Sequence, residues 1–295
     1  REIHICAEVP QATNRFLWAT VIIGDSPLKY RQHHIWSEPV IEGTGATTHL
    51  ESPHGIGLDA DGNILIADQK KNAVLRYTSE GEYLGLINSG SGRLPGEVED
   101  PRVVVSDSAG DIYVSDGKGD RPRIQVFNHA GEFLRIFAPK GILPGMILRG
   151  HGMGFGPQER LYVVDVDNMR VNVYEKSGEF LYDWGTEGLI TGGVNAPHGL
   201  FVDRNGDVFV NGYYGPTQKF NSIGDYLLSF CHGDPPDGPV FFHNMTGDRW
   251  GNAYVMVRTK SGGQGERQTA GRRVSIMKYN NNGDFVTEWA FTAPD

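Results

Sequence analysis

The sequence has little of several features that would point directly to one structural or functional class of protein. Its only cysteines are Cys6 and Cys231, so one disulfide and two free thiols are equally open and the redox compartment is not fixed. No apolar run approaches the roughly 18 residues of a membrane span. The longest candidate, residues 16–23, is too short. With 27 Lys and Arg against 36 Asp and Glu, the chain lacks the basic surface that a nucleic-acid partner requires.

The net charge of −9 is typical of a soluble protein. No signal-peptide pattern is present, and the chain begins at Arg1 rather than Met. We therefore expect a soluble protein that is either cytoplasmic or secreted after removal of a targeting segment. The oligomeric state is open.

What the sequence does have is an internal repeat. Five similar segments span residues 52–87, 100–137, 149–184, 196–230 and 241–291. Each holds four short runs that alternate apolar and polar residues, joined by turns rich in Gly, Asn and Asp. Four antiparallel strands repeated at about 40–50 residues are typical of the blades of a β-propeller. With residues 1–48 as the sixth blade, we predict an all-β, six-bladed β-propeller that forms a single domain over residues 1–295.

One position near the start of each repeat carries an unusual residue. The five lead residues are His54, Arg102, His151, His198 and His243. In a propeller, the first strand of each blade lines the central channel, so we expect the lead residues to converge around the axis. Converging neutral imidazoles are ligands for a divalent transition metal, and three His with an open position form a catalytic zinc arrangement. The alternative is that each His merely lines a wet channel.

The repeat has the pattern Pro-x-Gly-x-x-Val-Asp, Gly-Asn/Asp-x-Tyr/Val-Val-x-Asp and Gly-x-Phe-x-x-x-Phe, and over residues 52–291 it resembles the NHL repeat. Among NHL enzymes the chain looks like peptidylamidoglycolate lyase, with local matches at residues 112–117, 123–127 and 33–36. The resemblance implies Zn²⁺, or another first-row divalent metal, held by His54, His151 and His243. It places Arg102 and His198 on the intervening blades.

The chain departs from that family at three functional positions. Lys118 stands where the family has a catalytic Tyr, Val166 where it has a catalytic Arg, and Asn244 where an Asp holds a structural Ca²⁺. The carbonyl of Ile56 matches another calcium ligand, so a structural Ca²⁺ site stays a candidate. The departures imply the same metal chemistry with a different substrate.

Several residues are candidates for the remaining chemistry. Tyr213 and Tyr214 are acid–base candidates, because a phenol beside a metal can ionise and accept a proton. Lys118 would act as a base or hold a substrate carboxylate. Arg102 would neutralise an anionic group. His198 is a candidate fourth metal ligand or a general base.

Two further features recur or stand out. Asp68, Asp116 and Asp165 end the second strand of three repeats, and we interpret them as structural carboxylates that bind turn amides. The Gly-rich insertion at residues 260–273 is a candidate lid over the predicted metal site.

Three functions are compatible with these patterns. The first is a metal-dependent lyase acting on a small hydroxylated or amide-bearing molecule or peptide. The second is a metallohydrolase of an ester, lactone or amide. The third is a non-catalytic NHL scaffold, which would bind no metal.

Overall fold

The computed structural model describes most of the five repeats and parts of the N-terminal region. The described residues are 2–8, 16–22, 50–117, 119–188, 191–212, 215–231, 240–248, 250–259 and 273–292. The chain divides into two compact units, Arg1–Phe137 and Ala138–Asp295. The prediction of one domain over residues 1–295 stays a prediction.

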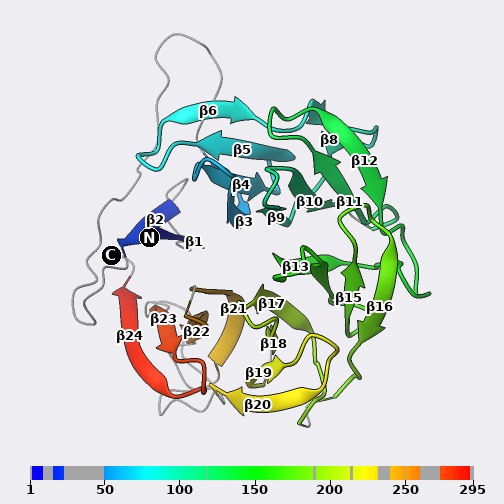
Figure 1. Ribbon diagram of the computed structural model, residues 1–295. Coiled ribbons are helices and arrows are strands. Elements are labelled where there is room, and N and C mark those ends of the chain that lie inside the picture. Colours follow the sequence, from blue (N-terminus) through cyan, green and yellow to red (C-terminus); the bar gives the residue numbers. More distant parts are fainter. Residues whose placement is uncertain are drawn as a thin grey trace, which may run out of the picture. The chain divides into compact units, whose positions relative to one another are not determined.

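The first unit contains two four-stranded antiparallel blades (Figure 1). Blade 1 is formed by β3 (Pro53–Leu58), β4 (Ile64–Asp68), β5 (Ala73–Tyr77) and β6 (Tyr83–Leu86). Blade 2 is formed by β9 (Val103–Ser106), β10 (Ile112–Asp116), β11 (Arg123–Phe127) and β12 (Phe133–Phe137). Two small sheets accompany them, the antiparallel pair β1 (Glu2–Glu8) and β2 (Phe16–Ile22) and the parallel pair β7 (Gly90–Ser91) and β8 (Glu97–Val98).

The second unit contains three four-stranded antiparallel blades. Blade 3 is formed by β13 (Gly150–Phe155), β14 (Leu161–Asp165), β15 (Arg170–Tyr174) and β16 (Phe180–Trp184). Blade 4 is formed by β17 (Pro197–Val202), β18 (Val208–Gly212), β19 (Thr217–Phe220) and β20 (Tyr226–Phe230). Blade 5 is formed by β21 (Val240–Gly247), β22 (Ala253–Thr259), β23 (Arg273–Tyr279) and β24 (Phe285–Thr292).

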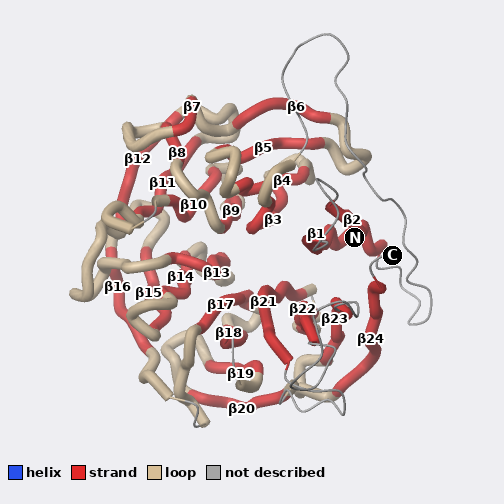
Figure 2. Tube along the Cα trace, turned by 180° about the vertical axis from the view of Figure 1, so that it is seen from behind, coloured by secondary structure: helices blue, strands red, loops and turns tan. Residues whose placement is uncertain are grey.

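The described residues are all strand, turn and loop (Figure 2), so the all-β prediction is confirmed. No helix long and apolar enough to cross a membrane occurs among them. The blade count differs from the prediction of six, because five four-stranded blades are present in the described part of the chain. Residues 1–48 contribute only the two-stranded sheet β1–β2 there.

The first turn of most blades is closed by an aspartate. In blade 1, Asp59 Oδ1 accepts hydrogen bonds from the backbone N–H groups of Asp61 (3.0 Å) and Asn63 (2.9 Å). Gly62 follows with a φ of 83°, a conformation that glycine adopts without steric cost. The same side-chain bonds recur at Asp107, Asp203 and Asp248. Local turn chemistry therefore sets the spacing of the first two strands.

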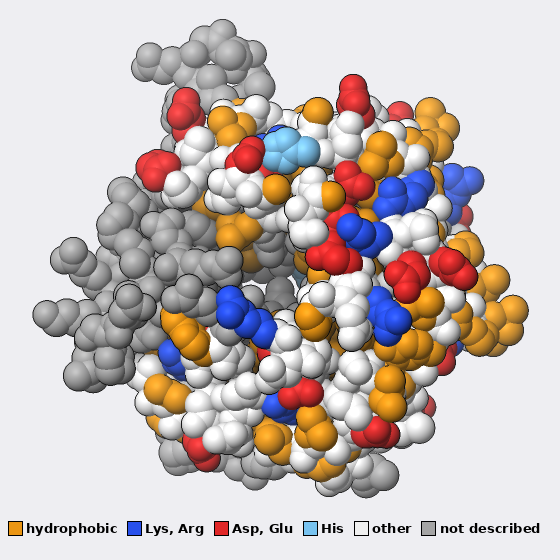
Figure 3. All heavy atoms as spheres, viewed as in Figure 1, with side chains coloured by type: hydrophobic (Ala, Val, Ile, Leu, Met, Phe, Trp, Pro, Cys, Tyr) orange, Lys and Arg blue, Asp and Glu red, His pale blue; other side chains and the backbone are white. Residues whose placement is uncertain are grey.

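The hydrophobic core lies between neighbouring blades of each unit. Every residue of β4, β10 and β14 is buried. In the second unit, Phe201 and Phe209 stack with ring centroids 4.3 Å apart and pack against Met245 of blade 5. On the part of the surface that is not grey in Figure 3, acidic and basic side chains are interspersed.

The structure settles part of the cysteine question, because Cys231 is a free thiol. Burial raises the pKa of this thiol to about 11, despite a hydrogen bond with Tyr279 that opposes the shift. A thiol with a raised pKa is mostly protonated at neutral pH and is a poor nucleophile. Cys231 is therefore part of the packing in blade 5 and its neighbourhood rather than a reactive group.

First strands of successive blades approach each other closely within each unit. A Cβ atom built on Gly55 of β3 would lie 2.3 Å from the carbonyl oxygen of Arg102. In the second unit, a Cβ on Gly152 would lie 2.7 Å from the carbonyl oxygen of His198. A Cβ on Gly199 would lie 2.7 Å from the backbone nitrogen of Met245. Only glycine fits at these positions, which explains why a glycine follows three of the lead histidines.

We expect Gly55→Ala to destabilise the first unit, because the added methyl group would overlap backbone that cannot move independently. Overpacking of this kind costs about 1–3 kcal/mol. Urea unfolding of the variant and the parent chain measures the loss. Gly90→Ala in β7 is the matched control, since a Cβ there meets nothing within 4 Å. Equal stability of Gly55→Ala and Gly90→Ala would show that the first strands can separate.

Candidate functional site

The four lead histidines share a backbone irregularity. The pairing register between the first and second strand shifts across His54, His151, His198 and His243. In blade 2 the regular pairing begins at Val103, opposite Ser115, and the backbone N–H of Arg102 also donates to the carbonyl of Ser115 at 2.9 Å. A β-bulge redirects a side chain and is common next to functional sites. The four histidines therefore share one local backbone feature.

In the first unit, the ring of His54 is held by the neighbouring blade. His54 Nδ1 lies 3.1 Å from the carbonyl oxygen of Arg102. A carbonyl only accepts hydrogen bonds, so Nδ1 carries the proton in this contact. In the neutral ring, the lone pair is then on Nε2, which is the nitrogen that a metal would use.

Arg102 is held by an acidic partner. Its guanidinium donates from Nη2 to Asp100 Oδ2 at 2.6 Å, and both side chains are largely buried. Asp100 has a φ of 56° and its backbone N–H donates to Asn72 Oδ1 at 2.8 Å. Arg102 was predicted as an anion-neutralising group. The carboxylate of Asp100 already compensates part of its charge.

In the second unit, His151 and His198 lie side by side. Their ring centroids are 4.2 Å apart with an interplanar angle of 41°, and His151 is only 8% exposed. His198 Nδ1 lies 3.1 Å from the carbonyl oxygen of Ala196, a residue with a φ of 42°. His198 therefore also carries its proton on Nδ1 in this contact.

A buried amide that supports this arrangement was not predicted as a functional residue. Asn211 of β18 is fully buried, and its Oδ1 accepts a hydrogen bond from the backbone N–H of Gly199 at 2.7 Å. Gly199 is part of the bulge at His198, so Asn211 fixes the backbone that carries this ring. The corresponding residues in blades 1 and 3 are Ala67 and Val164. An amide at a position that is apolar in blades 1 and 3 was the signal available in the sequence.

The other predicted site residues are described in part or not at all. Lys118, Tyr213, Tyr214 and the candidate lid at residues 260–273 lie outside the described residues. His243 lies in β21, but its side chain is not described. Among the side chains that are described, no group of three His, Cys, Asp or Glu could hold a metal ion. The predicted ligand set draws on both compact units and stays a prediction.

The aspartates that end the second strands have the structural role predicted for them. Asp68 accepts hydrogen bonds from the backbone N–H of Ser52 at 2.9 Å, and Asp165 accepts from that of Leu148 at 3.0 Å. Asp116 pairs with Arg123, whose Nε donates to Oδ1 at 2.8 Å. Burial nevertheless raises the pKa of both Asp116 and Asp165, because desolvation of the carboxylate outweighs these hydrogen bonds.

Solved structures similar to this chain include proteins with enzymatic names. A catalytically inactive histidine-to-alanine variant of virginiamycin B lyase from Staphylococcus aureus, with quinupristin, is 10% identical, covers 100% of both chains and has a TM-score of 0.56. A gluconolactonase from Xanthomonas campestris is 17% identical over 69% of this chain and 68% of its own, with a TM-score of 0.53. A protein of unknown function from Bacteroides caccae is 14% identical over 98% of this chain and 93% of its own, with a TM-score of 0.60.

These likenesses show the fold alone, which is that of an all-β propeller. No family model matches the sequence. Protein brain tumor of Drosophila melanogaster is 26% identical over 136 residues, which is 44% of this chain. The matched part is 13% of the fly protein's length.

We expect the raised pKa of Asp165 to appear in the pH dependence of unfolding. A carboxyl group whose folded-state pKa is raised contributes stability that is full below its unfolded value of about 4 and is lost as pH rises through the folded value. Asp165→Asn does not titrate, so the stability of the parent chain relative to this variant should fall as pH rises above about 4. Urea unfolding at a series of pH values tests this. A difference that stays constant or grows with pH contradicts the raised pKa.

Proposed function

We propose that this chain is a metal-dependent lyase whose divalent ion, Zn²⁺ or another first-row metal, is held by His54, His151 and His243. The observation that carries the proposal is the register shift that the four histidine-led strands share, each at its lead histidine. A β-bulge redirects a side chain and is common next to active sites, so the shared shift supports a set of ligands aimed at one ion.

The chemistry of the described histidines fits a metal of this kind. His54 and His198 each direct Nδ1 at a backbone carbonyl. Metal-ligating histidines usually donate their other ring N–H to a carbonyl or carboxylate, which fixes the tautomer and the direction of the ring. The calcium ion implied by the family resemblance has less support. Asn244 replaces the family's Asp, and its Oδ1 accepts a hydrogen bond from the backbone N–H of Met245 at 2.9 Å.

The residues of this chain would bind the substrate and move its proton. When bound, the metal would polarise a hydroxyl or carbonyl oxygen of a small hydroxylated or amide-bearing substrate. Arg102, held by Asp100, would orient a carbonyl or anionic group. The phenol oxygen of Tyr213 or Tyr214, or Nζ of Lys118, would accept the proton. His198 would serve as a fourth ligand or as the general base.

The resemblance to peptidylamidoglycolate lyase supports a lyase, and so does the fold shared with virginiamycin B lyase. Lys118 and Val166 occupy the family's catalytic Tyr and Arg positions, so we propose a substrate different from that of the amidating enzyme. A metallohydrolase of an ester, lactone or amide is the second candidate, and the gluconolactonase with the same fold favours it.

The first test is the metal content of the purified chain, without a histidine tag and without added metal, measured by elemental mass spectrometry. We expect about one equivalent of a first-row metal. His54→Ala, His151→Ala or His243→Ala should each lower metal content at least about tenfold. His198→Ala should keep the metal and lower turnover.

The matched control is His129→Ala. His129 is a partly exposed histidine paired with Asp61 and lies outside the lead positions, so this change should leave metal content unaltered. Full metal content in the three ligand variants would refute the assignment. No metal even after reconstitution would favour the non-catalytic scaffold.

A second measurement separates the two enzyme classes. Metal-loaded protein that turns over a hydroxylated amide, ester or lactone would be assayed in ¹⁸O-labelled water. A hydrolase transfers the label to its product, because water supplies the new oxygen. A lyase breaks the bond without adding water, so we expect no enzyme-dependent label. Incorporation at every turnover would replace the lyase proposal with the hydrolase.

A further inference from the structure

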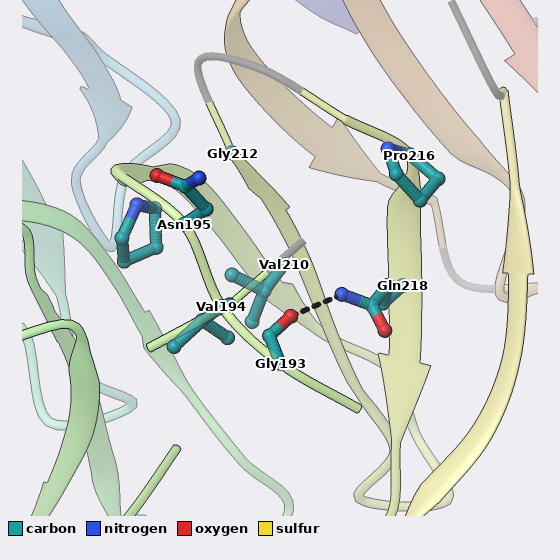
Figure 4. A pocket seen from close by; sticks show the side chains of 9 residues that line it. Gly193, Val194, Asn195, Val210, Gly212, Pro216 and Gln218 are labelled. Carbon is teal, nitrogen blue, oxygen red and sulfur yellow. Dashed lines mark hydrogen bonds between the residues drawn. The ribbon is translucent and has the colours of Figure 1, made fainter. Parts of the chain in front are cut away.

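Blade 4 contains a pocket that the proposed metal chemistry does not use. Its lining residues are Gly188, Gly193, Val194, Asn195, Pro197, Val210, Gly212, Pro216 and Gln218 (Figure 4). The space outside protein atoms is about 290 Å³, part of it open solvent, and none of the lining side chains is charged. All of these residues belong to the second unit.

The pocket occupies the place where other blades keep a carboxylate. Gly212 pairs with Pro197 of the first strand, as Asp165 pairs with Gly150 in blade 3 and Asp68 with Pro53 in blade 1. Gly212 therefore stands at the register position of the structural aspartates.

Blade 4 also lacks the cationic side chain that pairs with the aspartate in blade 2. Phe127 pairs with the first residue of β10, and Phe220 pairs with the first residue of β18. Arg123 and Pro216 each lie four residues before these phenylalanines, so Pro216 corresponds to Arg123. In blade 2, Arg123 lies against Asp116. Blade 4 thus lacks both members of the ion pair that is buried in blade 2.

The groups that would bind a carboxylate are still present. In blade 2, Gln125 Nε2 donates to the carbonyl of Glu97 at 2.6 Å and also to Asp116 Oδ2 at 3.0 Å. In blade 4, Gln218 Nε2 donates to the carbonyl of Gly193 at 2.5 Å in the same manner. A primary amide has a second N–H, and Gly212 has no side chain to accept it.

A backbone donor is retained too. The N–H of Leu148 donates to Asp165 in blade 3, and that of Glu99 donates to Asp116 in blade 2. Asn195 occupies the same place relative to its first strand and lines the pocket. The next N–H, that of Ala196, is directed at the sulfur of Met169 at 3.1 Å. A thioether is a weak acceptor, whereas the corresponding N–H of Arg149 binds Asp165.

We propose that this pocket binds a small carboxylate, which takes the place of the side chain that Gly212 lacks. Its oxygens would accept hydrogen bonds from the N–H of Asn195 and from Gln218 Nε2. Its hydrogen or alkyl substituent would lie toward the opening. This site needs no metal, so it can fail or hold independently of the proposed lyase activity.

Formate is the probe, because it is the smallest carboxylate. The limit on binding free energy per atom restricts so small a ligand to about millimolar affinity or weaker. The ¹⁵N-labelled full chain would be titrated with sodium formate to about 100 mM, with sodium chloride holding ionic strength constant. We expect saturable shifts of the Asn195 backbone amide and the Gln218 side-chain amide in NMR spectra. The absence of saturable shifts there would overturn the proposal.

Gly212→Asp supplies the carboxylate from the chain itself and should weaken formate binding at least about tenfold. The matched control, Asn205→Asp, adds the same charge at an exposed turn of blade 4 and should leave formate binding unchanged. Formate shifts that persist in a folded Gly212→Asp protein would refute the site. If that variant does not fold, the titration of the parent chain still decides the proposal.

Discussion

The close approach of neighbouring first strands is the constraint on which the described site depends. Blades packed this tightly leave no room for a Cβ atom at Gly55, Gly152 or Gly199. The residue before each of these glycines is then held between two blades, and its side chain has a defined direction. A rigid backbone of this kind suits a group that must meet a ligand with fixed geometry.

Much of the fold could be predicted from the sequence, because each repeat encodes its own strands and turns. Aspartates such as Asp59 close the first turn through bonds within five residues, and alternation of apolar residues marks the strands. The blade count was wrong because it assumed that residues 1–48 follow the same rules. The described part of that segment holds only the two-stranded sheet β1–β2.

The lead histidines could be found from spacing, but their surroundings could not. Nothing in the sequence shows that the carbonyl of Arg102 would meet His54, or that Asp100 would hold the Arg102 guanidinium. Both contacts depend on the backbone conformation of blade 2, which includes the left-handed φ of Asp100. A sequence pattern shows which residue types recur. It does not show the contacts of main-chain atoms, because these depend on the folded structure.

The contact between His54 and the carbonyl of Arg102 crosses from one blade to the next. The direction of this imidazole is thus set by main-chain atoms that no side-chain replacement removes. A change inside blade 2 that displaces its first strand would rotate a ring in blade 1 without touching it. If function depends on the direction of this ring, changes that shift the backbone of the neighbouring strand would be tolerated less well than changes that replace its side chains.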